Sequence, residues 1–215
     1  MIPILFKKNQ DDKLKILCLG AHPDDIEIGC GGTIQKLSVD YDTDISWIVL
    51  SGNERRKKEA ITCAEKFLTK TGSNNIKVMS FKESYFPYTA IEIKQSIDSL
   101  KKIAPDIVFT HTRHDLHQDH RLISELTWNS FRDHLILEYE IPKYDGDLKT
   151  PNLFFHLNSK ICENKINNII SSHVSQNNKQ WFDNETFMGL MRIRGIESNS
   201  PTKYAEGFYC RKIVM

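Results

Sequence analysis

The chain has 215 residues, of which 40% are hydrophobic and 27% are charged, and its formal net charge at pH 7 is +1. This length and composition predict one globular domain spanning residues 1–215 and leave too little chain for a second. The near-neutral charge gives no electrostatic reason to expect nucleic acid or an anionic membrane as a partner, and no run reaches the ~18 apolar residues that a membrane span needs.

The amino-terminal residues and the cysteines predict a cytoplasmic protein. A short apolar patch at 2–6 precedes Lys7 and Lys8, which reverses the order of charge and apolar run in a signal peptide. The five cysteines are scattered, and no two form a CxxC pair. This usage is typical of reduced thiols rather than of disulfides or a cysteine-type zinc site. The sequence leaves open whether the chain forms a homo-oligomer.

Strand-like apolar runs alternate with helix-like segments along the chain. Strands are expected at 15–20, 45–50, 76–81, 106–110, 135–141, 153–157 and 207–215. Helices are expected at 31–39, 54–70, 91–103, from 121 to about 132, at 163–173 and at 181–194, with a surface loop at 143–152. Such alternation with short connections is typical of βαβ units. It predicts a Rossmann-like, three-layer α/β fold with a mostly parallel central sheet.

The stretch AHPDDIEIGCGGT, residues 21–33, links the first predicted strand to the first predicted helix. Ligands of open α/β sheets collect at the carboxyl ends of the strands. A glycine-rich turn at this position usually binds a phosphate group, but the carboxylates of Asp24 and Asp25 would repel an anion. The stretch therefore predicts a cation site, to which His22 adds an imidazole.

A second cluster, HQDH at 117–120, follows the fourth predicted strand. In a right-handed parallel sheet the turns after these two strands lie at one edge, so the clusters face each other. His22, Asp25 and His120 would then supply two imidazoles and one carboxylate to one zinc ion, leaving a position for water. Other divalent metals, such as iron or cobalt, accept the same donors.

The remaining polar groups of the two clusters suit hydrolysis. Asp24 would take a proton from zinc-bound water, whose pKa the metal lowers to ~7. His117, expected one helical turn before His120 on the same side of the helix, would stabilise an oxyanion or protonate a leaving amine. Asp119 would hold a neighbouring histidine in the tautomer that the chemistry needs.

These motifs resemble a known family. AHPDDxE followed by GGT, together with HxDHR near the middle of the chain, is similar to the PIG-L/LmbE-like zinc-dependent N-deacetylases. Weaker matches extend the resemblance over most of the chain, at 56–59 (the RxxE position), 138–140, 175–176 and 204–208. In this chain the glutamate, Glu27, comes two residues after the second aspartate, which leaves it without an assigned role.

The resemblance implies a function and a set of site residues. The expected reaction is removal of the N-acetyl group from an N-acetylglucosamine-type amino sugar or its conjugate, a small-molecule substrate. Zinc is expected on His22, Asp25 and His120, with Asp24 as general base. His117 is expected as electrostatic stabiliser or acid. Arg56 is expected to contact a hydroxyl or phosphate group of the substrate.

Simpler interpretations remain for several residues. Arg56 also fits the solvated start of an amphipathic helix, and His111 and His114 fit surface or supporting positions rather than ligands. The glycines of GCGGT fit close packing between helix and strand. Two other functions use the same ligands: a metal-dependent ester or phosphoester hydrolase, and a catalytically inactive sugar-binding relative. A nucleotide-dependent Rossmann enzyme is disfavoured because GxGxxG is missing after the first strand.

Overall fold

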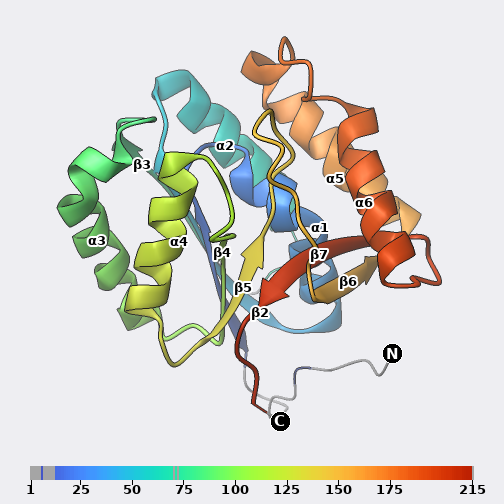
Figure 1. Cartoon of the computed structure of the whole chain (residues 1–215), viewed down its shortest axis with the longest axis horizontal. Helices are drawn as coiled ribbons and strands as arrows, with labels where there is room; N and C mark the ends of the chain where they lie inside the picture. Colours follow the sequence, from blue (N-terminus) through green and yellow to red (C-terminus); the bar gives the residue numbers. More distant parts are fainter. Residues whose placement is uncertain (1–5, 7–12, 70, 72, 215) are drawn as a thin grey trace.

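The computed structural model describes residues 6, 13–69, 71 and 73–214. Within these residues seven strands form one sheet in the order β3-β2-β1-β4-β5-β7-β6 (Figure 1). The strands are β1 (Leu14–Gly20), β2 (Thr43–Ser51), β3 (Ser73–Phe81), β4 (Ile107–His111), β5 (Leu135–Tyr139), β6 (Leu153–Leu157) and β7 (Tyr204–Cys210). Strands β1 to β5 pair in parallel, and β7 runs antiparallel to both β5 and β6. The prediction of a mostly parallel sheet is confirmed.

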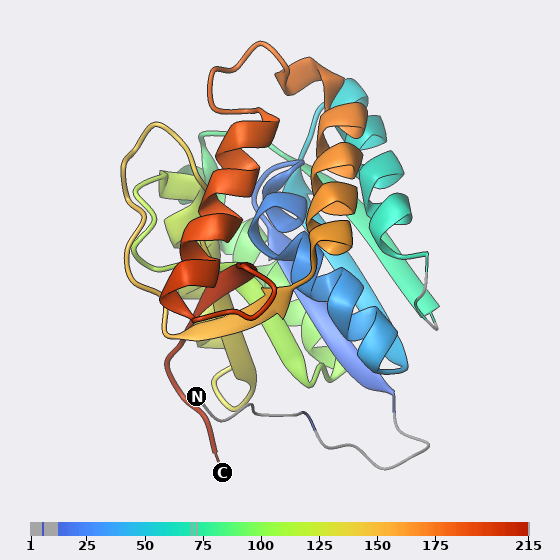
Figure 2. The same ribbon diagram turned by 90° about the vertical axis from the view of Figure 1, so that its right-hand side faces the viewer.

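Helices cover both faces of the sheet, which makes three layers (Figures 1 and 2). One face carries α1 (Asp25–Asp40), α2 (Glu54–Phe67), α5 (Ser159–Ser172) and α6 (Asn184–Glu197). The other carries α3 (Ala90–Ser99) and α4 (Gln118–Ser130). Short 3-10 turns are η1 (Phe86–Thr89), η2 (Leu100–Ile103) and η3 (Val174–Gln176). None of the helices in the described ranges is long and apolar enough to span a membrane.

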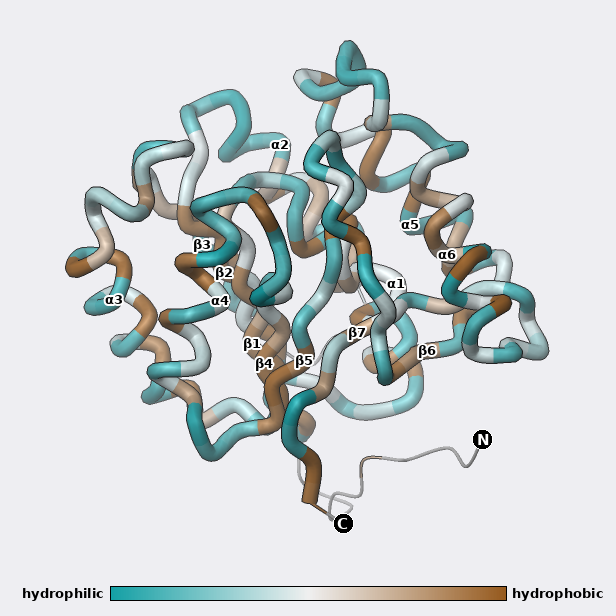
Figure 3. The backbone as a smooth tube through the Cα atoms, in the orientation of Figure 1, coloured by the Kyte–Doolittle hydropathy of each residue, from teal (hydrophilic) through white to brown (hydrophobic). Residues whose placement is uncertain are grey.

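The alternation of side chains along β1 builds two separate cores. Ile16 and Cys18 pack on the face of α1, whereas Leu17 and Leu19 pack on the face of α3 and α4, and all four are fully buried. In Figure 3, which colours the chain by residue hydropathy, the hydrophobic residues concentrate along the central strands. A strand that is buried on both faces has a continuous run of apolar residues, and this run allowed β1 to be predicted from the sequence.

The first helix begins earlier than the sequence predicted. Helix α1 starts at Asp25 rather than at residue 31, so Gly29 lies within the helix and not in the turn before it. The prediction was wrong because glycine is a poor helix former and reads as a turn. Packing explains the presence of the glycines: a Cβ on Gly29 would lie 2.2 Å from the Tyr139 ring, and one on Gly31 would lie 2.6 Å from Phe67. The predicted close packing between helix and strand is confirmed at Gly29, whereas Gly31 packs against the neighbouring helix α2.

Other predicted boundaries shift by a few residues. The strand predicted at 135–141 ends at 139, and the last strand covers 204–210 rather than 207–215. The helices predicted at 163–173 and 181–194 cover 159–172 and 184–197, and the one predicted at 91–103 divides into α3 and η2. The predicted helix 54–70 ends at residue 67. Positions 70, 72 and 215 and most of the amino-terminal apolar patch lie outside the described residues.

Replacing Gly29 by alanine is expected to destabilise the protein. The added methyl group would overlap the Tyr139 ring, whose hydroxyl donates a hydrogen bond to the Leu19 carbonyl at 2.6 Å and so resists movement. Overpacking of this kind lowers the free energy of unfolding by about 1–3 kcal/mol. The control is Gly189→Ala within α6, where no atom beyond the two chain neighbours and the adjacent backbone of the same helix lies within 4 Å of the new Cβ. There the helix preference of alanine should raise the free energy of unfolding by up to ~1 kcal/mol. Urea denaturation measures both, and equal effects would contradict the packing argument.

Candidate metal centre

The two polar clusters of the sequence meet at the point where the strand order reverses. Strands β1 and β4 are parallel neighbours, but the chain leaves β1 for α1 on one face and leaves β4 for α4 on the other. The connections therefore diverge at their carboxyl ends, and open α/β folds bind ligands in the crevice that results. The segments 22–25 and 117–120 lie at this crevice, as predicted.

Three potential donors lie close together in the crevice. The atoms His22 Nδ1 and His120 Nε2 are 3.0 Å apart, and His120 Nε2 lies 3.5 Å from Asp25 Oδ1. His22 Nδ1 lies 3.6 Å from Asp25 Oδ2, and all three side chains are buried. Ligands of a tetrahedral zinc ion, each about 2.0–2.2 Å from the metal, lie roughly 3.3 Å from one another. The donor set and its spacing therefore fit a zinc ion.

Carboxylates on the far side of each imidazole turn the other ring nitrogen toward this centre. His22 Nε2 lies 3.0 Å from Asp119 Oδ2, and His120 Nδ1 lies 2.8 Å from Asp115 Oδ2. A carboxylate accepts a hydrogen bond, so each of these nitrogens carries its proton. Nδ1 of His22 and Nε2 of His120 then face each other with their lone pairs, and a cation, either a proton or a metal ion, must lie between them.

The pKa values of the two histidines shift in opposite directions. Burial lowers the pKa of His22, but the hydrogen bond to Asp119 and the charges of Asp25 and Glu83 outweigh it and raise the pKa overall. Burial and the nearby His111 lower the pKa of His120 to about 3, so this ring is neutral, as a metal ligand must be. The pKa of Asp25 is well below its usual range because the histidines outweigh its burial.

The two orienting carboxylates are themselves held in place. Asp119 accepts hydrogen bonds from the backbone N–H groups of Ser84 at 2.6 Å and Phe86 at 3.2 Å. Asp115 accepts one from the His117 N–H at 2.8 Å and lies 3.1 Å from Lys143 Nζ. Burial opposes ionisation, but the hydrogen bonds to His120 and His22 lower the pKa of Asp115 and Asp119, respectively, below the usual range. Lys143 adds to the shift of Asp115, and the N–H groups of Ser84 and Phe86 add to that of Asp119. Both side chains are therefore ionised acceptors for their histidines.

Asp24 lies directly before α1 in an unusual conformation. Its φ of 115° is positive, a region that non-glycine residues rarely occupy, and its side chain does not cap the helix. The carboxylate instead lies 2.9 Å from the guanidinium of Arg56. Burial raises the pKa of Asp24 to about 6, although Arg56 opposes the shift. Backbone strain of this kind concentrates at functional sites.

Arg56 is buried rather than solvated, so the interpretation of this residue as an exposed helix start is wrong. Asn53 caps α2, and Arg56 lies in the first turn, where its guanidinium reaches back to Asp24 and to the Pro23 carbonyl. Nε of Arg56 has no hydrogen-bond partner among the described residues. The side chain is thus mainly committed to the turn that carries Asp24.

His117 precedes α4 instead of lying within it. Its ψ of 124° is extended, and its Nδ1 accepts a hydrogen bond from the Asp119 N–H at 3.2 Å, so Nε2 carries the proton. The expected helical spacing to His120 was wrong for this reason, yet the two ring centroids are only 4.6 Å apart. The His22 ring lies 4.8 Å away. Burial, with a contribution from His22, lowers the pKa of His117, so the ring is neutral and offers an N–H donor.

His111 is a supporting member of the site that the sequence placed only loosely. It is fully buried, its Nε2 accepts a hydrogen bond from the Ala21 N–H at 3.0 Å, and that nitrogen lies 3.2 Å from Asp25 Oδ2. Its ring stacks on His120 with centroids 3.9 Å apart. His111 with Asp25 and His120, and His117 with His22 and His120, are also groups close enough to hold a metal. In these groups, however, Nε2 of His111 and Nδ1 of His117 already accept hydrogen bonds from backbone N–H groups. His114 is exposed.

Asp115 is the residue that sequence reasoning missed. It was overlooked because attention fell on the HQDH motif, which starts two residues later. A usable signal was present: a histidine ligand needs an acceptor for its second nitrogen, and Asp115 lies in the turn that leads from β4 into the helix carrying His120. Glu27, which had no assigned role, faces His173 with 3.2 Å between Oε1 and Nε2, and both are fully buried.

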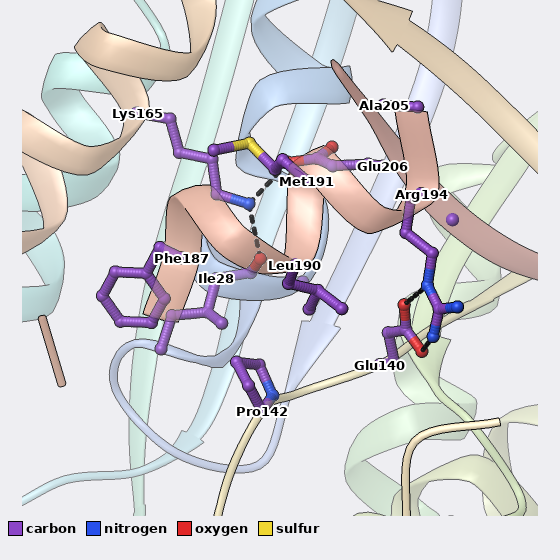
Figure 4. A pocket seen from close by; sticks show the side chains of 12 residues that line it. Ile28, Glu140, Pro142, Lys165, Phe187, Leu190, Met191, Arg194, Ala205 and Glu206 are labelled. Atoms are coloured by element: carbon purple, nitrogen blue, oxygen red, sulfur yellow. Dashed lines mark hydrogen bonds and ion pairs between the residues drawn. The ribbon is translucent and has the colours of Figure 1, made fainter. Parts of the chain in front are cut away.

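A second charged cluster lies behind α1 and has a structural role (Figure 4). Lys165 Nζ donates to the Ile28 carbonyl and to Glu206 Oε1, both at 2.6 Å, and Arg194 forms a two-point ion pair with Glu140. Glu206 also accepts from two backbone N–H groups of α1. The cavity among these residues is about 20 Å³, room for one water molecule. Lys165 and Glu206 join α1 to α5 and β7, and the ion pair of Arg194 joins α6 to Glu140, directly after β5.

Comparisons with known proteins agree with this geometry. The sequence profile of the family described as PIG-L, GlcNAc-PI de-N-acetylase, matches residues 17–131. The diacetylchitobiose deacetylase of Thermococcus kodakarensis is 33% identical over 136 residues, which cover 54% of this chain and 49% of that protein. The matched part thus spans about half the length of that relative.

Solved structures share the fold over nearly the whole chain. N,N'-diacetylchitobiose deacetylase from Pyrococcus horikoshii, in complex with an inhibitor, superimposes with a TM-score of 0.72 at 22% identity, covering 93% of this chain and 84% of that one. The 4-carboxy-2-hydroxymuconate hydratase from Pseudomonas putida gives 0.69 at 16% identity, covering 94% and 97%. Because one fold carries both a deacetylase and a hydratase, the reaction must be argued from the site.

Proposed function

Because this chain belongs to the PIG-L family, we propose that it is a zinc-dependent hydrolase that removes the N-acetyl group from an N-acetylglucosamine-type amino sugar or its conjugate. The observation that carries the proposal is the pair of imidazole nitrogens, 3.0 Å apart beside a carboxylate, that need a cation between them. Metal-dependent amide hydrolysis also needs a base next to such a centre, and Asp24 precedes the ligand Asp25 directly.

In this proposal His22, Asp25 and His120 hold one zinc ion per chain. When bound, the ion would polarise the amide carbonyl and lower the pKa of a water molecule to ~7. Asp115 and Asp119 keep the two imidazoles in the ligand tautomer. Other divalent ions accept these donors, so the metal in the cell is a matter for measurement.

Proton transfer falls to Asp24 and His117. Asp24 takes the proton of the attacking water, and its pKa of about 6 places it near the range in which a general base is most effective. His117 presents Nε2–H, which donates a hydrogen bond to the oxyanion that develops on the amide oxygen. The amine then leaves as it accepts from Asp24 the proton that this carboxylate took from the water.

Arg56 takes a different role from the substrate contact implied by the resemblance. Its guanidinium is paired with Asp24 and with the Pro23 carbonyl. We propose that it positions the base in its strained conformation. A contact with substrate through the unpartnered Nε would be an addition to this role.

Acetate release from defined substrates tests the function. The zinc-loaded protein is expected to release acetate from N-acetylglucosamine or N,N'-diacetylchitobiose, with the free amine appearing in equal amount. Parallel assays with p-nitrophenyl acetate and p-nitrophenyl phosphate test the ester and phosphoester alternatives. Exclusive hydrolysis of either would overturn the assignment, and calorimetric binding of the sugar without turnover would indicate an inactive sugar-binding relative.

A further inference from the structure

The segment between β3 and α3 is built into the candidate metal centre. Ser84 and Phe86 donate their backbone N–H groups to Asp119, the carboxylate that orients His22. The side chain of Gln118, at the start of α4, donates back to the Ser84 carbonyl. The Phe86 ring is fully buried with its centroid 6.0 Å from that of His22. The segment is therefore fixed at the edge of the site by contacts on both sides of residue 85.

Two tyrosines on this fixed segment are left uncovered. The relative exposures of Tyr85 and Tyr88 are 46% and 81%, and their ring centroids are 6.1 Å apart. Apart from Tyr144, no other Phe, Tyr or Trp among the described residues is exposed to this degree. Ser84 adopts a positive φ of 68°, a conformation that needs support from its surroundings. Exposed aromatic rings on a rigid, strained segment beside a site indicate a contact surface for a ligand.

The groups around the rings indicate which ligand fits. Lys82 Nζ lies 3.8 Å from the centroid of the Tyr85 ring, and Glu83, whose charge acts on His22, is exposed beside it. Tyrosine rings present a flat apolar face and a polar hydroxyl. A pyranose ring is the complement, because it has one face of C–H groups and a rim of hydroxyls. Lys82 covers one face of the Tyr85 ring, and an aliphatic chain on the other face would offer neither charged group a hydrogen bond.

We propose that Tyr85 and Tyr88 form a stacking platform for a second sugar ring, linked to the ring whose acetamide reacts. The inference rests on the proposed deacetylase function and names a substrate class for it: N-acetylated disaccharides and longer glycans rather than free monosaccharides. The rings bind the distal sugar through their faces, and Lys82 and Glu83 contact its hydroxyls. The backbone N–H groups of the same segment continue to hold Asp119, so the platform and the metal centre keep a fixed relative position.

Substrate-length dependence tests the platform. In the zinc-loaded enzyme with Tyr85→Ala and Tyr88→Ala combined, the KM for N,N'-diacetylchitobiose is expected to rise about tenfold or more, from the loss of two ring contacts. The KM for N-acetylglucosamine and the kcat for both sugars should stay within twofold. The corresponding double phenylalanine variant keeps the ring faces and should retain most of the disaccharide selectivity. Zinc content should stay at the wild-type level in every variant.

The matched control is Tyr144→Ala, which removes from the loop after β5 a ring whose exposure, 70%, lies between those of Tyr85 and Tyr88. A selective loss of disaccharide affinity in this variant would place the second sugar on the opposite side and overturn the platform. Equal losses for both sugars, or no loss in the double alanine variant, would also overturn it. Calorimetric binding of the disaccharide to Asp24→Asn, with and without the platform tyrosines, gives a readout without turnover. Platform-dependent binding with no acetate release by the wild type would refute the deacetylase function alone, and absence of binding would refute the platform.

Discussion

Asp24→Asn is expected to keep the metal and lose turnover by about 10²–10⁴-fold, the contribution typical of general acid–base catalysis. Asparagine has nearly the shape of aspartate but cannot accept the proton of the attacking water. It also tolerates a positive φ better than most residues, so the strained backbone at φ 115° should persist. The measurement is kcat for acetate release by zinc-loaded protein, with metal content determined on the same sample.

The matched control is Asp40→Asn, at the exposed last turn of the same helix, where the carboxylate pairs only with Lys36 in the described residues. That variant should equal the wild type in activity and metal content. Turnover within tenfold of wild type for Asp24→Asn would mean that another group accepts the proton. Loss of zinc from Asp24→Asn would make this residue part of the ligand set instead.

Loss of the metal is the second large effect. A chelator should abolish acetate release, and added zinc should restore it, because the ion provides both the polarised carbonyl and the activated water. His120→Ala should prevent the restoration, since it removes one of the three proposed donors. Bound zinc should also stabilise the fold, by about 4 kcal/mol at a free concentration of 1,000 times Kd. Thermal unfolding with and without zinc measures this difference.

A substitution of Asp115, the carboxylate that orients His120, tests the metal site without removing a proposed ligand. Asp115→Asn leaves every proposed ligand in place but weakens the hold on His120 Nδ1, and should lower zinc affinity by roughly 10–100-fold. A competition titration against a chromogenic chelator measures the affinity. The exposed His114 provides a control, because His114→Ala removes an imidazole from the same turn and should bind zinc as the wild type does. Unchanged zinc affinity in His120→Ala would overturn the proposed site, because both other groups of donors at the crevice also include His120.

The sequence predicted the parts of the site that depend on strand position alone. His22 and Asp25 follow one buried strand and His120 follows another, and parallel packing brings the ends of neighbouring strands together. The sequence did not predict partners that come from a third element. The hydrogen bonds from the N–H groups of Ser84 and Phe86 to Asp119 depend on the path of the chain after β3. The insertion of β7 between β5 and β6 was equally hidden, because antiparallel pairing of distant segments leaves no local signal.

The predicted helix limits were wrong where the helix propensity of a residue disagrees with the packing around it. Gly29 and Gly31 lower the helix propensity of α1, but the close contacts with Tyr139 and Phe67 require them there. The predicted exposure of Arg56 to solvent was wrong for a related reason. A charged residue in a first turn usually faces water, and only the fold shows that Asp24 lies within its reach. Local rules therefore located the elements, while tertiary contacts decided their ends and the partners of their side chains.

The segment after β3 is attached to Asp119 through backbone groups, and this attachment restricts its length more than its side chains. Only the backbone of Ser84 and Phe86 holds the carboxylate, so the side chains at 85 and 88 are free to vary without disturbing His22. A one-residue insertion or deletion in this segment would instead displace an N–H group and loosen the histidine. We therefore expect the segment to tolerate substitutions at 85 and 88 but not a change in its length.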